Sequence, residues 1–180
     1  MSDFAEEIYR LQELSGADFI AQLKLVITRA EFHPLDDNPN IFIVGGEHSG
    51  DYHNLLNAAK KAVAQGYNVF ILPNPKGKRT ADFIFEQKGN VKMYDLKTIQ
   101  GASSVSNRLK ESIGQSNRVL LNIRCSYNAR LLAMDIKMFF QLNSEAIEVL
   151  IFKGRKSISV SRYQINSPRF DKEFRKQYEK

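Results

Sequence analysis

A short charged hairpin between Thr80 and Thr98 constrains the fold of this chain more than any other stretch. Two runs rich in β-branched and aromatic residues, 82–86 and 91–97, flank a connector that contains Gly89. This pattern predicts two antiparallel strands joined by a tight turn. Because side chains alternate between the two faces of a sheet, the pairing register decides which residues lie together.

Two registers are open, and both bring the same three charged residues to one face. With Lys88 and Gly89 as the loop, Asp82 lies directly opposite Asp95. With the loop one residue later, Asp82 faces Lys97, and Asp95 lies on the diagonal. Alternation with a period of two puts all three on the same face in either case. We therefore expect Asp82, Asp95 and Lys97 to point the same way.

This charged face has two interpretations. Like charges opposite each other on paired strands are destabilising, and a bound Mg²⁺ would offset them, because hard cations take carboxylate oxygens. Lys97, about 7 Å along the strand from Asp95, would then reach a metal-bound water or a phosphate. The alternative is a cross-strand ion pair between Asp82 and Lys97 on a solvated face, with Asp95 simply exposed.

Composition and length describe an ordinary soluble protein. The chain has 180 residues, of which 43% are hydrophobic and 26% are charged, which suits one domain with a substantial core. No apolar run approaches the roughly 20 residues of a membrane span. The first seven residues are acidic, whereas a signal peptide begins with basic residues. We therefore expect no membrane partner, no signal peptide and a cytoplasmic site of action.

Cysteine and histidine usage excludes several kinds of site. A single cysteine, Cys125, rules out an internal disulfide framework and a cysteine-rich zinc site. The three histidines all precede residue 54, in a different segment from Cys125, so no Ser-His-Asp or Cys-His hydrolase arrangement is indicated.

Charge is distributed unevenly along the chain. Residues 1–75 carry 5 Lys or Arg against 10 Asp or Glu, a balance of −5, and residues 76–180 carry 21 against 10, a balance of +11. The basic part begins just before the acidic hairpin. A positive surface around a small acidic spot suits a polyanionic substrate held near a metal ion.

Hydrophobic periodicity gives the order of the remaining elements. Helices are expected over 3–30, with a break at Ser15-Gly16, and over 52–63, 104–113 and 127–142. Further strands are expected over 67–72, 118–123, 146–152 and 157–163, with a loop over 33–40 and a charged tail over 169–180 that is either a solvated helix or frayed. The chain thus predicts an α/β (α+β) fold with a mixed central sheet, N-terminal helices, and a C-terminal helix and β-hairpin. Its expected parts are a helical appendage (1–40), the main domain (41–165) and a charged tail (166–180).

The element order and the charged hairpin together resemble a known superfamily. An αβββαβ run, with Asp82 at the second strand and Asp95-Leu96-Lys97 at the end of the third, resembles the restriction-endonuclease-like fold and its PD-(D/E)XK motif. Ala81 replaces the proline of that motif, which carries no chemistry. The resemblance implies a restriction-endonuclease-like core and a metal-dependent nuclease.

A closer resemblance lies in short segments between residues 45 and 163. The chain looks like the C-terminal tRNase domain of contact-dependent growth inhibition toxins, relatives of which occur in other polymorphic toxins and mobile elements. The segments that carry this likeness are Glu47 before a helix, Gly66-Tyr67-Asn68-Val69, Leu72-Pro73, Ala81-Asp82-Phe83, Asp95-Leu96-Lys97-Thr98, Arg108-Leu109-Lys110 and Gln115. The resemblance implies an endoribonuclease that cuts tRNA, with a catalytic group of Glu47, Asp82, Asp95 and Lys97. In toxin relatives an immunity protein covers that site.

These observations combine into one hypothesis with two alternatives. Asp82 and Asp95 hold Mg²⁺, or alternatively Mn²⁺ or Zn²⁺, Glu47 completes the site, and Lys97 orients the attacking water. The alternatives are a DNA endonuclease with the same site and a nucleic-acid-binding module without chemistry. Basic residues expected to hold the phosphate backbone are Lys76, Lys78, Arg79, Arg108, Lys110, Lys153 and Arg155. The oligomeric state stays open.

Overall fold

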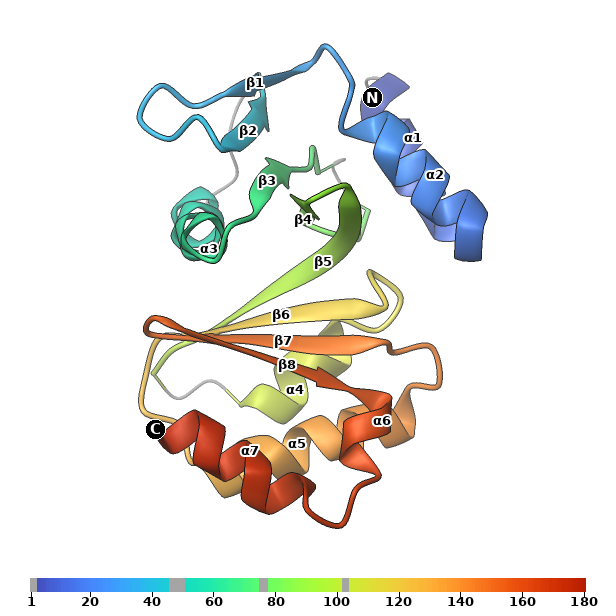
Figure 1. Ribbon diagram of the computed structural model, residues 1–180. Coiled ribbons are helices and arrows are strands. Elements are labelled where there is room, and N and C mark those ends of the chain that lie inside the picture. Colours follow the sequence, from blue (N-terminus) through green and yellow to red (C-terminus); the bar gives the residue numbers. More distant parts are fainter. Residues whose placement is uncertain (1–2, 46–50, 75–77, 102–103) are drawn as a thin grey trace. The chain divides into compact units, whose positions relative to one another are not determined.

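The chain forms two compact units, which share one long strand (Figure 1). The computed structural model describes residues 3–45, 51–74, 78–101 and 104–180. The first unit comprises residues 1–95 and 114–116, and the second comprises residues 96–113 and 117–180. The described residues contain seven α-helices and eight strands in a mixed arrangement, which confirms the expected α+β class.

Five strands form the sheet of the first unit. They are β1 (Phe32–Pro34), β2 (Ile41–Val44), β3 (Asn68–Ile71), β4 (Phe83–Gln87) and β5 (Asn90–Ile99), which enters the second unit at Leu96. Neighbours in the sheet follow the order of the chain. The β2–β3 pair is parallel, whereas the β1–β2, β3–β4 and β4–β5 pairs are antiparallel. The three-strand meander β3–β4–β5 contains the charged hairpin.

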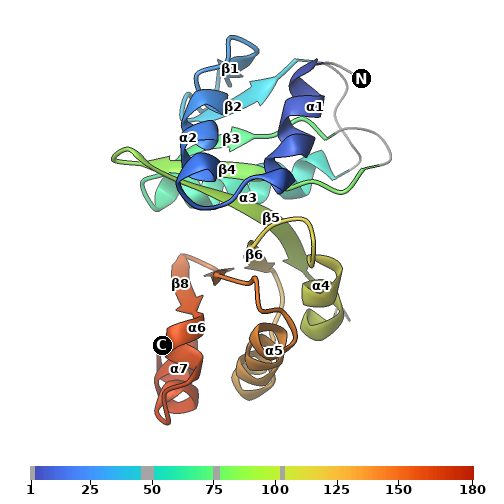
Figure 2. The same ribbon diagram turned by 90° about the vertical axis from the view of Figure 1, so that its right-hand side faces the viewer.

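Helices lie on both sides of this sheet. On one side are α1 (Asp3–Arg10), the 3₁₀ turn Leu11–Glu13 and α2 (Gly16–Val26). Their apolar residues share one core with strand residues that include Phe70, Ile84 and Met93. Helix α3 (Tyr52–Ala64) packs on the other side through three buried alanines (Figure 2). The helical pattern of residues 3–30 therefore produces a bent pair with its break at Ser15-Gly16, as expected.

The second unit is a layer of strands covered by helices. Its strands are the end of β5, β6 (Arg118–Ile123), β7 (Glu148–Lys153) and β8 (Lys156–Ser161). Its helices are α4 (Val105–Glu111), α5 (Ala129–Leu142), α6 (Arg162–Ile165) and α7 (Phe170–Glu179). The β6–β7 pair is parallel and the β7–β8 pair is antiparallel. Residues from all four helices join one core with alternate residues of β6, β7 and β8.

Two local expectations were wrong. The stretch 33–40 was expected to be a loop, but it begins inside β1, which pairs antiparallel with β2 from Phe32 to Pro34. The charged tail was expected to be either a solvated helix or frayed; it is a helix, but α7 buries an aromatic residue on each of its turns: Phe170, Phe174 and Tyr178. The tail is therefore an amphipathic helix of the second unit's core.

None of the helices in the described ranges has the length and apolar character needed to cross a bilayer.

A buried carboxyl group supports the packing of α4 against α5. The Tyr127 hydroxyl accepts a hydrogen bond from the Val105 N–H (3.3 Å) and donates one to Asp135 Oδ2 (3.0 Å). Asp135 is 9% exposed, and this burial raises the pKa of its carboxyl, although the bond from Tyr127 opposes the rise. The charged form of Asp135 is therefore less favourable in the folded chain than in the unfolded one.

We expect Asp135→Asn to change how stability depends on pH. With a folded-state pKa above the unfolded value, Asp135 destabilises the fold progressively as pH rises through the folded pKa. An asparagine keeps the acceptor for Tyr127 but cannot ionise. The variant should gain unfolding free energy relative to the native chain as pH rises from about 3 to about 8. Urea denaturation at several pH values measures this difference, and a difference that does not change with pH would contradict the prediction.

Candidate functional site

The charged hairpin adopts the first of the two registers. Strand pairing runs from Gln87 opposite Asn90 to Phe83 opposite Tyr94. The loop is therefore Lys88 and Gly89, with φ values of 51° and 83°. Two successive residues with positive φ are what a two-residue type I′ hairpin turn requires. The paired positions end there, and Asp82 and Asp95 each lie directly beyond this last pair.

Hydrogen bonds of its peptide groups hold Asp82 between two strands. Asp82 lies directly before β4, where its N–H donates to the Tyr94 carbonyl (3.0 Å). Its own carbonyl accepts from the Leu72 N–H on the other side (2.9 Å). Both neighbours are buried residues of the meander. The backbone of Asp82 is thus fixed next to the residue that precedes Asp95.

Alternation along β5 relates Asp95 to the face of the sheet on which α1 and α2 pack. Ile84 and Met93 lie opposite each other, and both belong to the core beneath these helices. Asp95 lies two residues beyond Met93 on β5, so alternation places it on that same face. Asp82 precedes β4, where Ala81 belongs to the same core as Ile84, so the side chains do not alternate strictly there. Lys97 lies two residues beyond Asp95 on β5 and follows the same alternation.

Burial distinguishes this arrangement from a solvated surface. Asp95 is 1% exposed, Lys97 is 7% exposed, and Asp82 is half-buried. The part of the ion-pair interpretation that left Asp95 exposed is therefore wrong. Burying a carboxylate or an ammonium group is costly unless other charges, hydrogen bonds or a metal ion stabilise it. Adjacent carboxylates of this kind are suitable ligands for a hard divalent cation.

The predicted third ligand cannot be compared with this geometry. Glu47 lies outside the described residues, as does Lys76 in the basic loop. Among the residues that the structure describes, no group of three or more His, Cys, Asp or Glu side chains is arranged to hold a metal ion. The described part of the proposed site is therefore Asp82, Asp95 and Lys97.

Residues of the N-terminal helices contact the basic loop that leads to Asp82. Lys78 Nζ lies 3.6 Å from Glu6 Oε2 and 3.9 Å from the centre of the Tyr9 ring. The side chain of Gln12 donates to the carbonyl of Arg79 (2.8 Å). Sequence analysis missed these contacts, although an acidic first helix and a basic loop are complementary in charge. The helices thus help to fix the start of the segment that carries Asp82.

A second segment that was not predicted lies beside β5. The Ser116 hydroxyl donates to the carbonyl of Met93 (2.9 Å), two residues before Asp95. Gln115 and Ser116 are 8% and 9% exposed. The polar residues of this turn are therefore candidates for positioning the end of β5.

The predicted backbone-binding cations differ in how available they are. Lys78 is engaged as described above, Arg108 pairs with Glu111 (2.8 Å), and Lys153 donates to the Cys125 carbonyl. The exposed members of the set that the structure describes are Arg79, Lys110 and Arg155. Of these, Arg79 belongs to the first unit, and Lys110 and Arg155 belong to the second. These three are the strongest candidates for contact with a phosphate backbone.

Comparison with known proteins adds no relative. No protein-family model, curated protein or solved structure matches the chain.

Proposed function

We propose that the chain is a metal-dependent endonuclease that hydrolyses phosphodiester bonds of structured RNA, with tRNA as the expected substrate. The observation that supports this proposal is the hairpin register, whose last pair is Phe83 and Tyr94, the chain neighbours of Asp82 and Asp95, with Lys97 two residues further along β5. Carboxylate oxygens are the ligands that hard divalent cations prefer, and the exclusion of water from Asp95, which is 1% exposed, strengthens its attraction for a cation.

Each residue has a role in this proposal. Asp82 and Asp95 supply carboxylate oxygens to a divalent cation, and Glu47 completes or orients their site. Bound there, Mg²⁺ would supply charge stabilisation at the scissile phosphate and a more acidic water. Lys97 donates hydrogen bonds that orient the attacking water, and the exclusion of bulk water from Asp95 strengthens these interactions. Mn²⁺ and Zn²⁺ are alternative cations for the same oxygens.

Charge supports a polyanionic substrate. Residues 76–180 carry a balance of +11, and Arg79, Lys110 and Arg155 are exposed, so their side chains can reach a phosphate backbone. The choice of RNA over DNA rests on the resemblance to toxin tRNase domains. The same resemblance is the basis for proposing a toxin or mobile-element origin and an immunity protein as partner.

Metal removal tests the proposal directly. We expect the purified chain to cut tRNA in Mg²⁺, to lose this activity in EDTA, and to regain it when excess Mg²⁺ or Mn²⁺ is added. Gel analysis of tRNA, an unstructured RNA and a DNA duplex separates the alternatives. Cleavage of the DNA duplex alone would replace the proposal with a DNA endonuclease. Salt-sensitive RNA binding without cleavage in any of the three cations would replace it with a binding module.

A further inference from the structure

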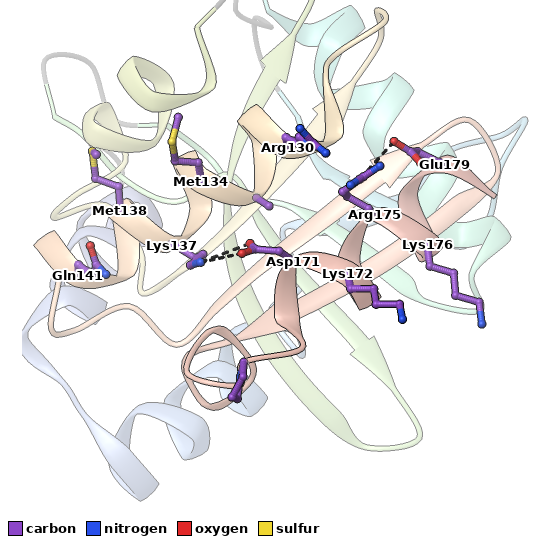
Figure 3. A pocket seen from close by; sticks show the side chains of 12 residues that line it. Arg130, Met134, Lys137, Met138, Gln141, Asp171, Lys172, Arg175, Lys176 and Glu179 are labelled. Atoms are coloured by element: carbon purple, nitrogen blue, oxygen red, sulfur yellow. Dashed lines mark hydrogen bonds and ion pairs between the residues drawn. The ribbon is translucent and has the colours of Figure 1, made fainter.

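A groove runs between α5 and α7 in the second unit. It has a volume of about 980 Å³, and side chains of both helices line it (Figure 3). Two ion pairs lie within it: Lys137 Nζ is 3.1 Å from Asp171 Oδ2 and joins the two helices, and Arg175 Nε is 3.8 Å from Glu179 Oε1. The groove is separate from the Asp82–Asp95 face, which belongs to the first unit.

The α5 side of the groove contains an exposed apolar stripe beside Arg130, Lys137 and Gln141. Met134 and Met138 line the groove and are 55% and 44% exposed. Leu131 and Leu142, which are 42% and 63% exposed, extend the same stripe at both ends of the helix. These four residues follow the three- and four-residue spacing of one helix face and span roughly 16 Å along the axis. Exposed, contiguous apolar residues of this kind mark interaction sites, and methionines adapt to the shape of a partner.

Both sides of the groove carry basic residues. Lys172 and Lys176 extend from α7 on the side of the Lys137–Asp171 pair opposite to the two methionines (Figure 3). In all, five cations and two carboxylates line the groove, and both carboxylates are in the ion pairs described above. No ion pair is recorded for Arg130, Lys172 or Lys176 within the described part of the chain. The groove therefore has a net charge of +3, to which the lining residues of α5 contribute +2 and those of α7 contribute +1.

We propose that this groove binds an acidic amphipathic helix of a partner protein. The partner's apolar stripe would lie against Met134 and Met138, and its carboxylates would face Lys172 and Lys176. A helix laid in a groove is recognised by apolar anchors about one turn apart, which is the spacing that α5 offers. A nucleic acid backbone is charged and polar, so it would leave Met134 and Met138 without an apolar partner. A flat bilayer does not fit a concave surface. The inference does not depend on the nuclease proposal.

A designed peptide provides the probe. It has about 18 residues, roughly 27 Å as a helix, with leucines at helical spacing and glutamates along one flank. A scrambled peptide of the same composition is its control. We expect fluorescence anisotropy to detect saturable binding of the designed peptide, and at least about tenfold weaker binding of the scrambled one. The peptide should also bind more weakly as salt is added.

Variants locate the binding to the groove. Met134→Asp with Met138→Asp should weaken peptide binding by at least about tenfold, and Lys172→Glu with Lys176→Glu should do the same. Matched controls are Leu25→Asp, at a residue 60% exposed in the first unit, and Lys60→Glu, at an exposed position of α3; both should leave binding unchanged. Circular dichroism of each variant checks that the fold is kept.

Exchanging the charges of the peptide and of the groove provides a second, independent test. A peptide with lysines in place of its glutamates should bind the Lys172→Glu and Lys176→Glu variant more tightly than it binds the native chain. Equal binding of designed and scrambled peptides, or binding that none of the groove substitutions changes, would overturn the proposal. Three other results, each without peptide binding, would assign the groove to another occupant. They are sedimentation with phosphatidylserine vesicles, RNA binding, and self-association in light scattering, provided that the groove substitutions abolish them.

Discussion

Replacing Asp95 with asparagine is expected to lower the rate of tRNA cleavage by about 10²- to 10³-fold, the usual effect of removing one group that stabilises charge at a reacting centre. Asparagine has nearly the same shape but brings no negative charge to the cation. The loss should be only partly restored by raising the Mg²⁺ concentration. Single-turnover cleavage over a range of Mg²⁺ concentrations measures both effects.

A stability measurement shows whether the loss of cleavage activity comes from the missing carboxylate or from unfolding. Asp95 is 1% exposed, and asparagine fills nearly the same volume, so the substitution leaves no cavity. The Asp95→Asn variant should therefore stay folded in EDTA, which circular dichroism and urea denaturation check. Asp36→Asn, at an exposed residue between β1 and β2, is the matched control and should keep full activity. Undiminished cleavage by a folded Asp95→Asn variant would disprove the assignment.

Replacing Phe174 with alanine is expected to destabilise the second unit by about 3–5 kcal/mol, the usual cost of truncating a buried phenylalanine. Phe174 is 2% exposed, and its ring centre lies 5.6 Å from that of Phe170 and 5.8 Å from that of Tyr178. The truncation removes the middle of this aromatic row and leaves a cavity under α7. Urea denaturation, followed by circular dichroism, measures the change in unfolding free energy.

The same helix provides the control for this prediction. Lys172 is exposed on the opposite side of α7, and Lys172→Ala should change the unfolding free energy by less than about 0.5 kcal/mol. If Phe174→Ala has as small an effect as Lys172→Ala, α7 does not contribute to the core as described.

The charged hairpin could be predicted from local sequence, but its register could not. Alternating apolar and charged residues around Gly89 are enough to indicate two paired strands. Asparagine accepts positive φ more readily than lysine does, so a loop of Gly89 and Asn90 was as reasonable as the observed one. The structure instead places Lys88 at a φ of 51°. The pairing of the strands and the packing of Ile84 and Met93 under α1 and α2 favour this register.

Two elements were missed for different reasons. Strand β1 has three residues and ends in Pro34, so it offers neither the length nor the alternation that identifies a strand. In α7 the signal was present, because Phe170, Phe174 and Tyr178 recur every four residues. The charged residues between them masked it. An apolar spacing of four identifies a buried helix face even in a highly charged segment.

At the candidate site, the sequence could predict that the Asp95 and Lys97 side chains point to the same face of β5, but it could not predict that both are buried. Alternation alone places Asp95 and Lys97 on one face of β5. Their exposure of 1% and 7% depends on which segments pack over the strand, and those segments are distant in sequence. The contacts of Glu6 and Gln12 with the loop before Asp82 depend on tertiary packing in the same way.

The path of the chain between the two units has a genetic consequence. The chain passes from the first unit to the second within β5, returns for residues 114–116, and leaves again. The first unit is therefore not encoded by one uninterrupted stretch of gene, and the second is divided by the same three residues. A recombination event with a single crossover either divides a unit or carries part of the other unit with it. Exchange of one unit alone therefore needs more than one crossover.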